Sequence, residues 1–374
     1  MLVRTYKYKL YHNIGTGSKN LNNLINISGL IYNRCIALHK RYYRLYGKSL
    51  NKFQLQKHLT KLKKLLKYSY WKALGSQAIQ NITERIDEGY KKFFKKQGGR
   101  PTFKKIKEYK SFTLKGKVGY KINDNVISLN GYNYKFWLSK PIDGKIKTVT
   151  VKRDNIGDFY ICISLEIENK INITTGKSVG IDFGLKQFLT LSDDTKIDAP
   201  LFHLKNLSKL KKLNRNLSKK KKGSNNRKIA KKQLAKLHIK IANQRKDYFH
   251  KLANELAFKY DNIFIEDLNI KAMQMLWGRK ISDLAFSEFV TILLYKANVH
   301  KIDRFYPSSK TCSSCNEINQ NINNDLKNLN DRIFSCKCGL EIDRDLNASI
   351  NIYRVGMSTL RLDTVRPRKE ARIA

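Results

Sequence analysis

The chain has 374 residues, enough to bury a sizeable core and to form two or three domains. Lysine and arginine number 75 against 30 aspartates and glutamates, which gives a formal charge of +45 and predicts a polyanionic partner. No apolar run reaches membrane-spanning length, and six cysteines are too few for a disulfide scaffold in so long a chain. We therefore expect no membrane partner and a reducing, cytoplasmic location.

The first part of the chain passes from strand-like to helix-like patterns and back. Residues 3–11 alternate tyrosine and leucine with lysine, the period of a half-buried strand. Apolar residues at three- and four-residue spacings then predict helices over 21–45, 53–66 and 79–93. Short strands are expected next, at 111–114, 125–129, 148–153 and 158–167. The pattern indicates a small β-barrel that is interrupted by a helical block.

Two later strands end in acidic residues. An apolar strand that begins near residue 178 ends in Asp182, and a second strand follows soon after Gly184. The short strand 262–265 leads in the same way into Glu266. A carboxylate at the end of a buried strand is costly unless it binds a cation or a hydrogen-bond donor. For one such residue alone, an ordinary turn aspartate is the simpler explanation.

A strongly basic stretch separates these two strands. Residues 199–246 contain seventeen lysines and arginines and no acid, and leucine spacing predicts two helices with a break at 219–226. A charged run is usually a solvated helix face, but helices without Glu–Lys pairs forgo a stabilising interaction. We therefore predict a phosphate-facing surface. Its candidate nucleic-acid-binding residues are Lys211, Lys212, Lys219, Lys220, Lys221, Lys222, Arg227, Lys228, Lys231 and Lys232.

Two cysteine pairs follow a predicted helix over 282–299 and a further strand. Cys312 and Cys315 form the first pair, and Cys336 and Cys338 form the second. Paired thiolates at this spacing suit one tetrahedral zinc ion. Four thiolates leave no open position for water, so this Zn2+ would be structural. The second pair has one residue fewer between its cysteines than the common C-x-x-C, which demands a tighter turn.

Acidic residues also begin the last predicted helix, at Asp343 and Asp345. Together with Asp182 and Glu266 they occur in the order strand, strand, helices, strand, helix, strand, helix, which is the plan of an α/β fold of the RNase H-like type. Carboxylates at neighbouring strand ends can hold two Mg2+ about 3.5–4 Å apart, one activating water and one stabilising the leaving 3′ oxygen. The sequence therefore predicts a Mg2+-dependent phosphodiester hydrolase.

With these features the chain resembles the TnpB (OrfB) family of insertion-sequence proteins, which are RNA-guided nucleases related to type V CRISPR effectors such as Cas12. The resemblance covers residues 178–354 and rests on GIDFGLKQFLTLSD, KLHIKIANQRKDYFHKLA, IFIEDLNIKAM, DRFYPSSKTCSSC and CGLEIDRDLNASINI. It implies that Asp182, Glu266 and Asp345 form a RuvC-type triad. Asp345 is preferred because the third acid of the family is the second aspartate of DRD-x-N-A, which leaves Asp343 free to cap the helix.

The resemblance also implies a domain plan and a set of partners. A wedge-like β-barrel would carry an inserted helical recognition region, followed by a RuvC-like nuclease domain with an inserted zinc ribbon. The partners would be a guide RNA from the element's own end, double-stranded DNA with a short flanking motif, and a companion transposase; in a prokaryote the protein would associate with the nucleoid. The expected ranges are 1–15 and 100–177 for the wedge, 16–99 for recognition, 178–310 and 342–356 for the nuclease, 311–341 for the zinc ribbon and 357–374 for a flexible tail.

The function that we expect is RNA-guided DNA cleavage by a protein encoded in a transposable element. One alternative is an RNA-guided repressor without cleavage, which the loss of an acid would indicate; all three acids are present. A second is a transposase that acts directly on the DNA ends of the element and needs no guide. A basic zinc-ribbon protein that binds RNA without catalysis is a third, but it leaves the positions of Asp182 and Glu266 unexplained.

Overall fold

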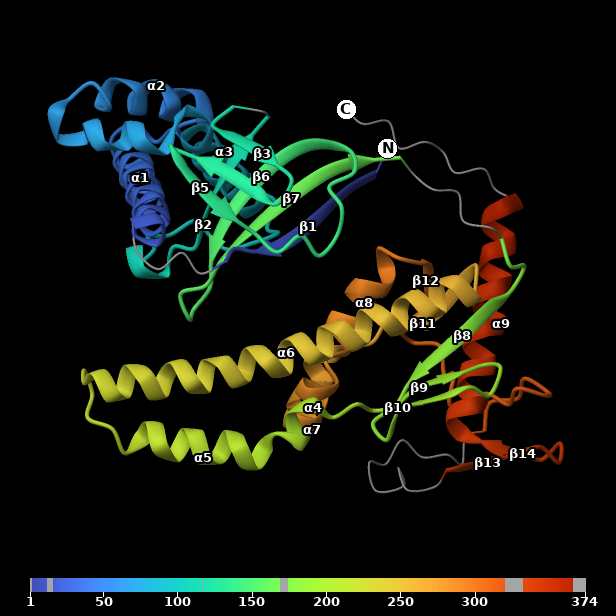
Figure 1. Ribbon diagram of the computed structural model, residues 1–374. Helices are drawn as coiled ribbons and strands as arrows, with labels where there is room; N and C mark the ends of the chain where they lie inside the picture. The colour runs from blue at the N-terminus through green and yellow to red at the C-terminus, as the bar shows by residue number, and fades with distance from the viewer. Residues whose placement is uncertain (1, 12–15, 117, 169–173, 320–331, 366–374) are drawn as a thin grey trace. The chain divides into compact units, whose positions relative to one another are not determined.

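The computed structural model describes residues 2–11, 16–116, 118–168, 174–319 and 332–365 (Figure 1). The chain divides into two compact units, Met1–Ile171 and Asn172–Ala374. Each unit has its own hydrophobic core. Among the residues that the structure describes, we find no helix with the length and hydropathy that crossing a bilayer requires.

The first unit contains two antiparallel sheets. One has the order β1 (Leu2–Lys9), β7 (Phe159–Ile167), β6 (Lys145–Arg153) and β2 (Ser111–Lys115). The other contains β3 (Tyr120–Asn123), β4 (Val126–Leu129) and β5 (Tyr132–Lys135), and a bridge between Leu10 and Phe136 joins it to the end of β1. The sequence pattern missed β3 and β5, because each of these four-residue strands buries a single side chain and shows no alternation.

Helices fill the chain between β1 and β2. The three predicted helices are confirmed as α1 (Thr16–Tyr46), α2 (Lys52–Leu62) and α3 (Ser76–Phe94). A 3₁₀ helix, Leu66–Leu74, connects the last two and was not predicted. The first helix ends at Gly47, whose φ of 63° lies in the left-handed region that glycine adopts readily.

The second unit is built on a five-stranded mixed sheet. Its order is β10 (Lys196–Asp198), β9 (Gln187–Leu191), β8 (Ser178–Phe183), β11 (Asn262–Glu266) and β12 (Asn298–Ile302). The strands β8, β11 and β12 are parallel, and β9 runs antiparallel to β8. The carboxyl ends of the three parallel strands therefore meet at one edge of the sheet, where α/β proteins place their ligands.

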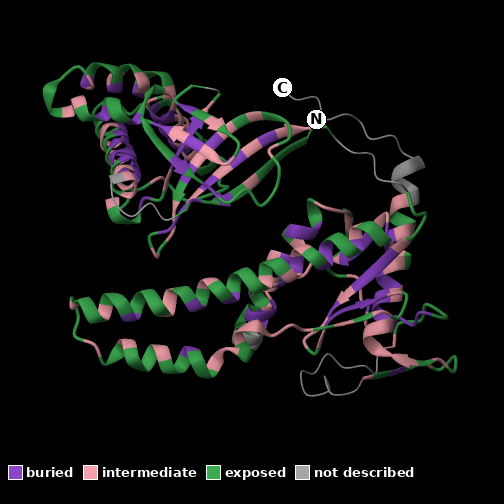
Figure 2. Cartoon of the chain, in the orientation of Figure 1, coloured by how far each residue is buried: buried purple, intermediate pink, exposed green. Residues whose placement is uncertain are grey.

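Helices cover both faces of this sheet. On one face, α6 (Asn225–Lys259) and α8 (Phe286–Leu294) pack against it, with Phe188 of β9 stacked 5.4 Å from Phe249. On the other face, α9 (Arg344–Val365) packs against β8, β11 and β12. The central strands β8, β9 and β11 are mostly buried between these layers (Figure 2). Burial on both faces explains why these three central strands are mostly apolar in sequence.

The contact between α9 and the sheet depends on two glycines. A Cβ on Gly180 of β8 would overlap the backbone of Ser349 and Tyr353 in α9. A Cβ on Gly356 of α9 would overlap the ring of Phe264 in β11. The helix thus lies closer to the strands than any larger residue at these positions would permit.

The basic stretch forms a helical hairpin. After the short helix α4 (Phe202–Lys205), α5 (Leu207–Ser218) runs back along the first half of α6. A small separate core, built around Leu210, Leu237 and Ile241, holds the two helices together. Most other positions along the hairpin are exposed (Figure 2), so its side chains are available to a partner.

Two boundaries differ from the sequence-based expectation. In place of one helix over 282–299, the structure has the end of α7 (Ile270–Leu284), then α8, then β12; the left-handed φ of 49° at Ala285 separates the two helices. The predicted flexible tail from residue 357 is also wrong at its start, because α9 continues to Val365. Residues 366–374 of that tail lie outside the described residues.

We predict that Gly356→Ala destabilises the second unit by about 1–3 kcal/mol, the usual cost of overpacking a tight contact. In a thermal unfolding experiment each kcal/mol corresponds to a decrease of about 2–4 °C for a unit of this size. Gly99→Ala is the control, since a Cβ at Gly99 meets nothing within 4 Å. Equal melting temperatures for the two variants would show that the α9 contact tolerates a larger spacing.

Candidate active site and metal centre

The predicted acids Asp182 and Glu266 lie side by side at the carboxyl edge of the sheet. In the parallel register Ile181 is opposite Ile265, and each acid is the next residue of its strand. Asp345 reaches the same place from the first turn of α9. Its Oδ2 atom lies 3.7 Å from the position that a Cβ on Gly184 would occupy, two residues after Asp182.

The pKa shifts of the three carboxyl groups agree with this closeness. Burial, followed by the negative charges of Glu266 and Asp345, raises the pKa of Asp182 to about 8. Burial also raises the pKa of Glu266 and of Asp345 above their ordinary values. Mg2+ prefers oxygen ligands, and its charge would offset the repulsion among the three carboxylates. The residues present therefore fit a divalent cation of this kind.

Asp343 has a different environment from Asp345. Its Oδ1 atom accepts hydrogen bonds from the backbone N–H groups of Asp345 (2.9 Å) and Leu346 (3.2 Å), so the predicted capping of α9 is confirmed. Its Oδ2 atom lies 2.9 Å from Nζ of Lys196. Burial opposes ionisation, but the ion pair and the two amides outweigh it and hold the pKa of Asp343 below its ordinary value.

A polar loop between β12 and the cysteines supports the acids, and the sequence analysis missed it. Ser308 donates a hydrogen bond to Oε1 of Glu266. Asn351 of α9 donates to the backbone oxygens of Ser308 (2.8 Å) and Thr311 (2.7 Å), and Asn347 donates to that of Thr311 (2.8 Å). Both asparagines are buried. The sequence did contain a signal, because two asparagines four residues apart on the apolar side of a helix indicate buried polar contacts.

The four predicted cysteines come together in the same unit. Their sulfur atoms all lie within 4.8 Å of one another. Sγ of Cys312 is 3.6 Å from that of Cys338, and Sγ of Cys315 is 3.6 Å from that of Cys336. Bonds of about 2.3 Å from zinc to sulfur in a tetrahedron give a sulfur–sulfur distance of about 3.8 Å. The arrangement can therefore hold one zinc ion.

A tight turn accommodates the short Cys336–Cys338 spacing. The N–H group of Gly339 donates to the carbonyl of Cys336 (3.0 Å), and Cys336 donates in turn to the carbonyl of Leu340 (2.9 Å). The φ of Gly339 is 89°, a conformation that favours glycine. The paired strands β13 (Ile333–Ser335) and β14 (Glu341–Asp343) flank this turn, and β14 leads directly into α9.

The basic hairpin presents most of its predicted residues to solvent, and two differ from the rest. Arg227 and Lys220 are half-buried. Nη1 of Arg227 donates to the carbonyls of Leu217 (2.9 Å) and Lys220 (2.8 Å) and so closes the end of α5. Arg215, which was not singled out, shares one face of α5 with Lys211, Lys212 and Lys219 around a surface hollow. Within the described residues, no acid lies within ion-pair distance of the stretch 205–240.

Comparisons with known proteins cover the same regions. The OrfB_IS605 family model, described as a probable transposase, matches residues 161–276, and the TNB domain of Cas12f1-like proteins matches residues 286–352. A Streptomyces pristinaespiralis protein, provisionally named an RNA-guided DNA endonuclease, is 28% identical over 98% of this chain and 93% of its own length. InsQ of Escherichia coli K12, with a similar provisional name, is 31% identical over 65% of this chain and 61% of its own.

The fold agrees with these matches. The Cas12f1 chain of a complex with sgRNA and target DNA superposes with a TM-score of 0.60, at 17% identity, over 90% of this chain and 82% of that chain. The chain therefore shares the fold of that Cas12f1 chain. The two family models, which match residues 161–276 and 286–352, and the relatives named above support membership of the TnpB family.

We predict that Asp182→Asn raises the melting temperature in buffer without magnesium. The increase should be at least about 2 °C, which corresponds to about 1 kcal/mol for a unit of this size. Because its pKa in the folded chain lies above that of an unfolded aspartate, Asp182 favours unfolding increasingly as the pH rises from about 4 to about 8. Glu266 and Asp345 oppose its ionisation and Arg344 favours it. The gain should therefore be larger at pH 8 than at pH 5.

The control for this experiment is Asp198→Asn, which changes an exposed acid on β10 of the same sheet. Its melting temperature should follow that of the unmodified chain at both pH values. A decrease for Asp182→Asn at pH 8 would contradict the proposed repulsion among the three carboxyl groups.

Proposed function

We propose that this protein is an RNA-guided DNA endonuclease of a transposable element, which cleaves target DNA by metal-assisted hydrolysis at Asp182, Glu266 and Asp345. The observation that carries the proposal is the convergence of these three carboxyl groups at the carboxyl edge of the sheet. An acid-free, exposed helical hairpin in the same unit supports it, since nucleic acid is the polyanion that such a surface attracts. The names of the family relatives agree with this activity.

The residues of the chain divide the chemical task among them. Asp182, Glu266 and Asp345 would hold Mg2+, which when bound supplies activation of water and stabilisation of the leaving oxygen. Ser308 orients the carboxylate of Glu266 by its hydrogen bond. Asp343 fixes the first turn of α9 and so directs Asp345 toward Asp182. The four thiolates would hold a structural Zn2+ that anchors the strand leading into α9.

The proposal extends to the partners and to the domain plan. A guide RNA from the element's own end would select the target by base pairing, and the protein would hold the paired strands by shape and backbone contacts. The first unit would supply the wedge and the helical recognition region, and the second unit the nuclease domain with its zinc ribbon. A short motif beside the target, a companion transposase and association with the nucleoid complete the proposal.

We predict that Asp182→Ala, Glu266→Ala and Asp345→Ala each abolish guided cleavage and leave target binding nearly unchanged, since the basic hairpin is untouched. The protein should be purified with its RNA and assayed on DNA that matches the variable end of that RNA. Asp198→Ala is the matched control and should cut normally, and Asp343→Ala should lose less activity than Asp345→Ala. Full Mg2+-dependent cleavage by any of the first three variants contradicts the triad.

The same assay separates the proposal from its alternatives. A repressor would bind the guided target and never cut it, even when unmodified. A transposase acting directly would cut element ends when free of RNA. Replacing Lys219, Lys221 and Lys222 by alanine should weaken binding, with a smaller salt dependence, and leave the cleaved sequence unchanged.

We predict one zinc ion per chain, measured by elemental analysis after extensive dialysis. Cys336→Ser and Cys338→Ser should each lower the zinc content and weaken thermal stability, because a thiolate ligand is lost from a closed site. Cys162→Ser, which changes a half-buried cysteine in β7 of the other unit, should retain full zinc. Active protein without zinc would refute a structural role for the ion.

A further inference from the structure

An exposed phenylalanine lies beside the candidate nuclease site. Phe305 follows β12 in the loop toward the cysteines, and 87% of its surface is accessible. A single exposed apolar side chain needs no explanation by itself. Two further observations, the rigid support of this loop and its place beside Glu266, distinguish Phe305 from other surface residues.

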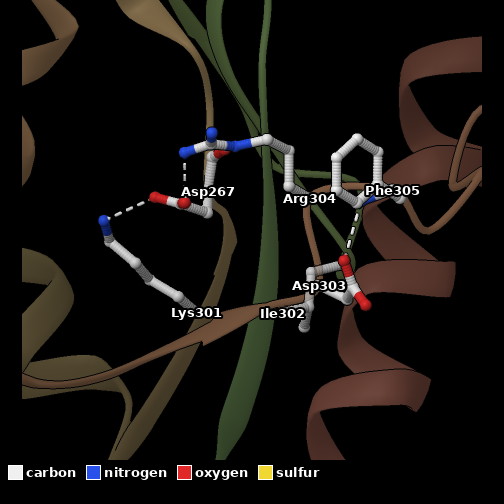
Figure 3. A pocket seen from close by; sticks show the side chains of 6 residues that line it. All are labelled: Asp267, Lys301, Ile302, Asp303, Arg304 and Phe305. Atoms are coloured by element: carbon white, nitrogen blue, oxygen red, sulfur yellow. Dashed lines mark hydrogen bonds and ion pairs between the residues drawn. The ribbon is translucent and has the colours of Figure 1, made fainter.

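The residues around Phe305 are fixed by hydrogen bonds and ion pairs. Its N–H group donates to Oδ1 of Asp303 (2.9 Å). Arg304 donates through Nε to the carbonyl of Asp267 (2.8 Å) and through Nη2 to its carboxylate (2.5 Å), and Nζ of Lys301 lies 2.8 Å from the same carboxylate. Figure 3 shows both cationic side chains pointing toward Asp267. A ring displayed on so fixed a loop loses little entropy when a ligand covers it.

This loop is also the support of the candidate nuclease site. In the register of β11 and β12, Glu266 lies opposite Ile302, and Asp267 is the residue that follows Glu266. Three residues after Phe305, Ser308 donates its hydrogen bond to Glu266. A surface pocket lined by Asp267 and by residues 301–305 therefore begins directly beside one of the three acids.

The chemistry of the pocket favours a planar, uncharged group. Its two cations, Lys301 and Arg304, both pair with Asp267, and Asp303 adds a second acid, so the formal charges of its lining balance. Such a lining gives no net attraction to a phosphate, while the exposed ring offers a stacking surface that every nucleobase can use. We propose that Phe305 stacks on the nucleobase that flanks the scissile phosphate of the strand being cut. This inference rests on the proposed nuclease function and deepens it.

Single-turnover cleavage by the guide-loaded protein tests the proposal. Phe305→Ala should slow cleavage about ten-fold, within the range expected for the loss of one base–aromatic stack, and leave target binding intact. Phe305→Trp should cut at nearly the normal rate. The matched control is Phe258→Ala, because Phe258 is also 87% exposed but lies at the end of α6, beside the amino end of β11.

Abasic substrates locate the contact. Removing one base beside the cut should slow the unmodified protein about as much as Phe305→Ala does, and the two changes together should cost no more than either alone. The inference would be overturned if, at every flanking position, the loss of the base and Phe305→Ala slowed cleavage additively. A lower melting temperature for Phe305→Ala with no dependence on the missing base would overturn it too, and would indicate that the ring packs against protein.

Binding without cleavage separates this inference from the proposed function. Single-stranded DNA that carries 2-aminopurine should lose fluorescence when the unmodified protein binds it without magnesium, and this quenching should be weaker with Phe305→Ala than with Phe258→Ala. Quenching without any guided cleavage would reject the proposed function and retain the stacking contact. Guided cleavage with identical quenching by both variants would reject the stacking contact alone.

Discussion

The approach of α9 to the central sheet is the contact on which the candidate site depends. Gly180 and Gly356 let the helix backbone lie against β8 and against the ring of Phe264. Asp345 belongs to the first turn of that helix, whereas Asp182 and Glu266 belong to the strands. Only the depth of the helix–sheet contact brings the third carboxyl group to the other two. Backbone geometry, more than side-chain choice, therefore assembles the acids.

The cluster of carboxyl groups opposes the stability of the unit that holds it. Their burial and mutual repulsion raise the pKa of Asp182 to about 8, and within the described residues no lysine or arginine forms an ion pair with the three acids. Cations nearby are directed elsewhere, as Lys196 is to Asp343 and Lys301 is to Asp267. The fold thus keeps its acids unpaired at the point where a metal ion and a phosphate would arrive.

Much of the site could be predicted because its signals are local in the sequence. Asp182 and Glu266 lie at the ends of short apolar strands, and the cysteines form close pairs. The residues next to each of them in the sequence therefore indicate its role. Ser308 gave no such signal, since its partner Glu266 is 42 residues away. The capping of α9 by Asp343 was predictable for the opposite reason, because cap and helix are adjacent.

The errors in the fold have a similar origin. Apolar residues continue beyond the end of α8, at Ala297 and Val299, so periodicity could not show where α8 ends and β12 begins. The strands β3 and β5 bury too few side chains to alternate. Arg227 looked like its basic neighbours, and only the turn of the hairpin reveals that its guanidinium group closes α5.

The continuity of α6 has a mechanical consequence. Its 35 residues span about 50 Å, with Phe249 and Leu256 packed in the sheet core at one end and Leu237 packed against α5 at the other. A helix without a break transmits rotation along its axis. One residue inserted between these two contacts would turn the whole hairpin by about 100° and redirect its lysines relative to the acids. The rotational position of this helix is therefore as important to the candidate site as the charges that it carries.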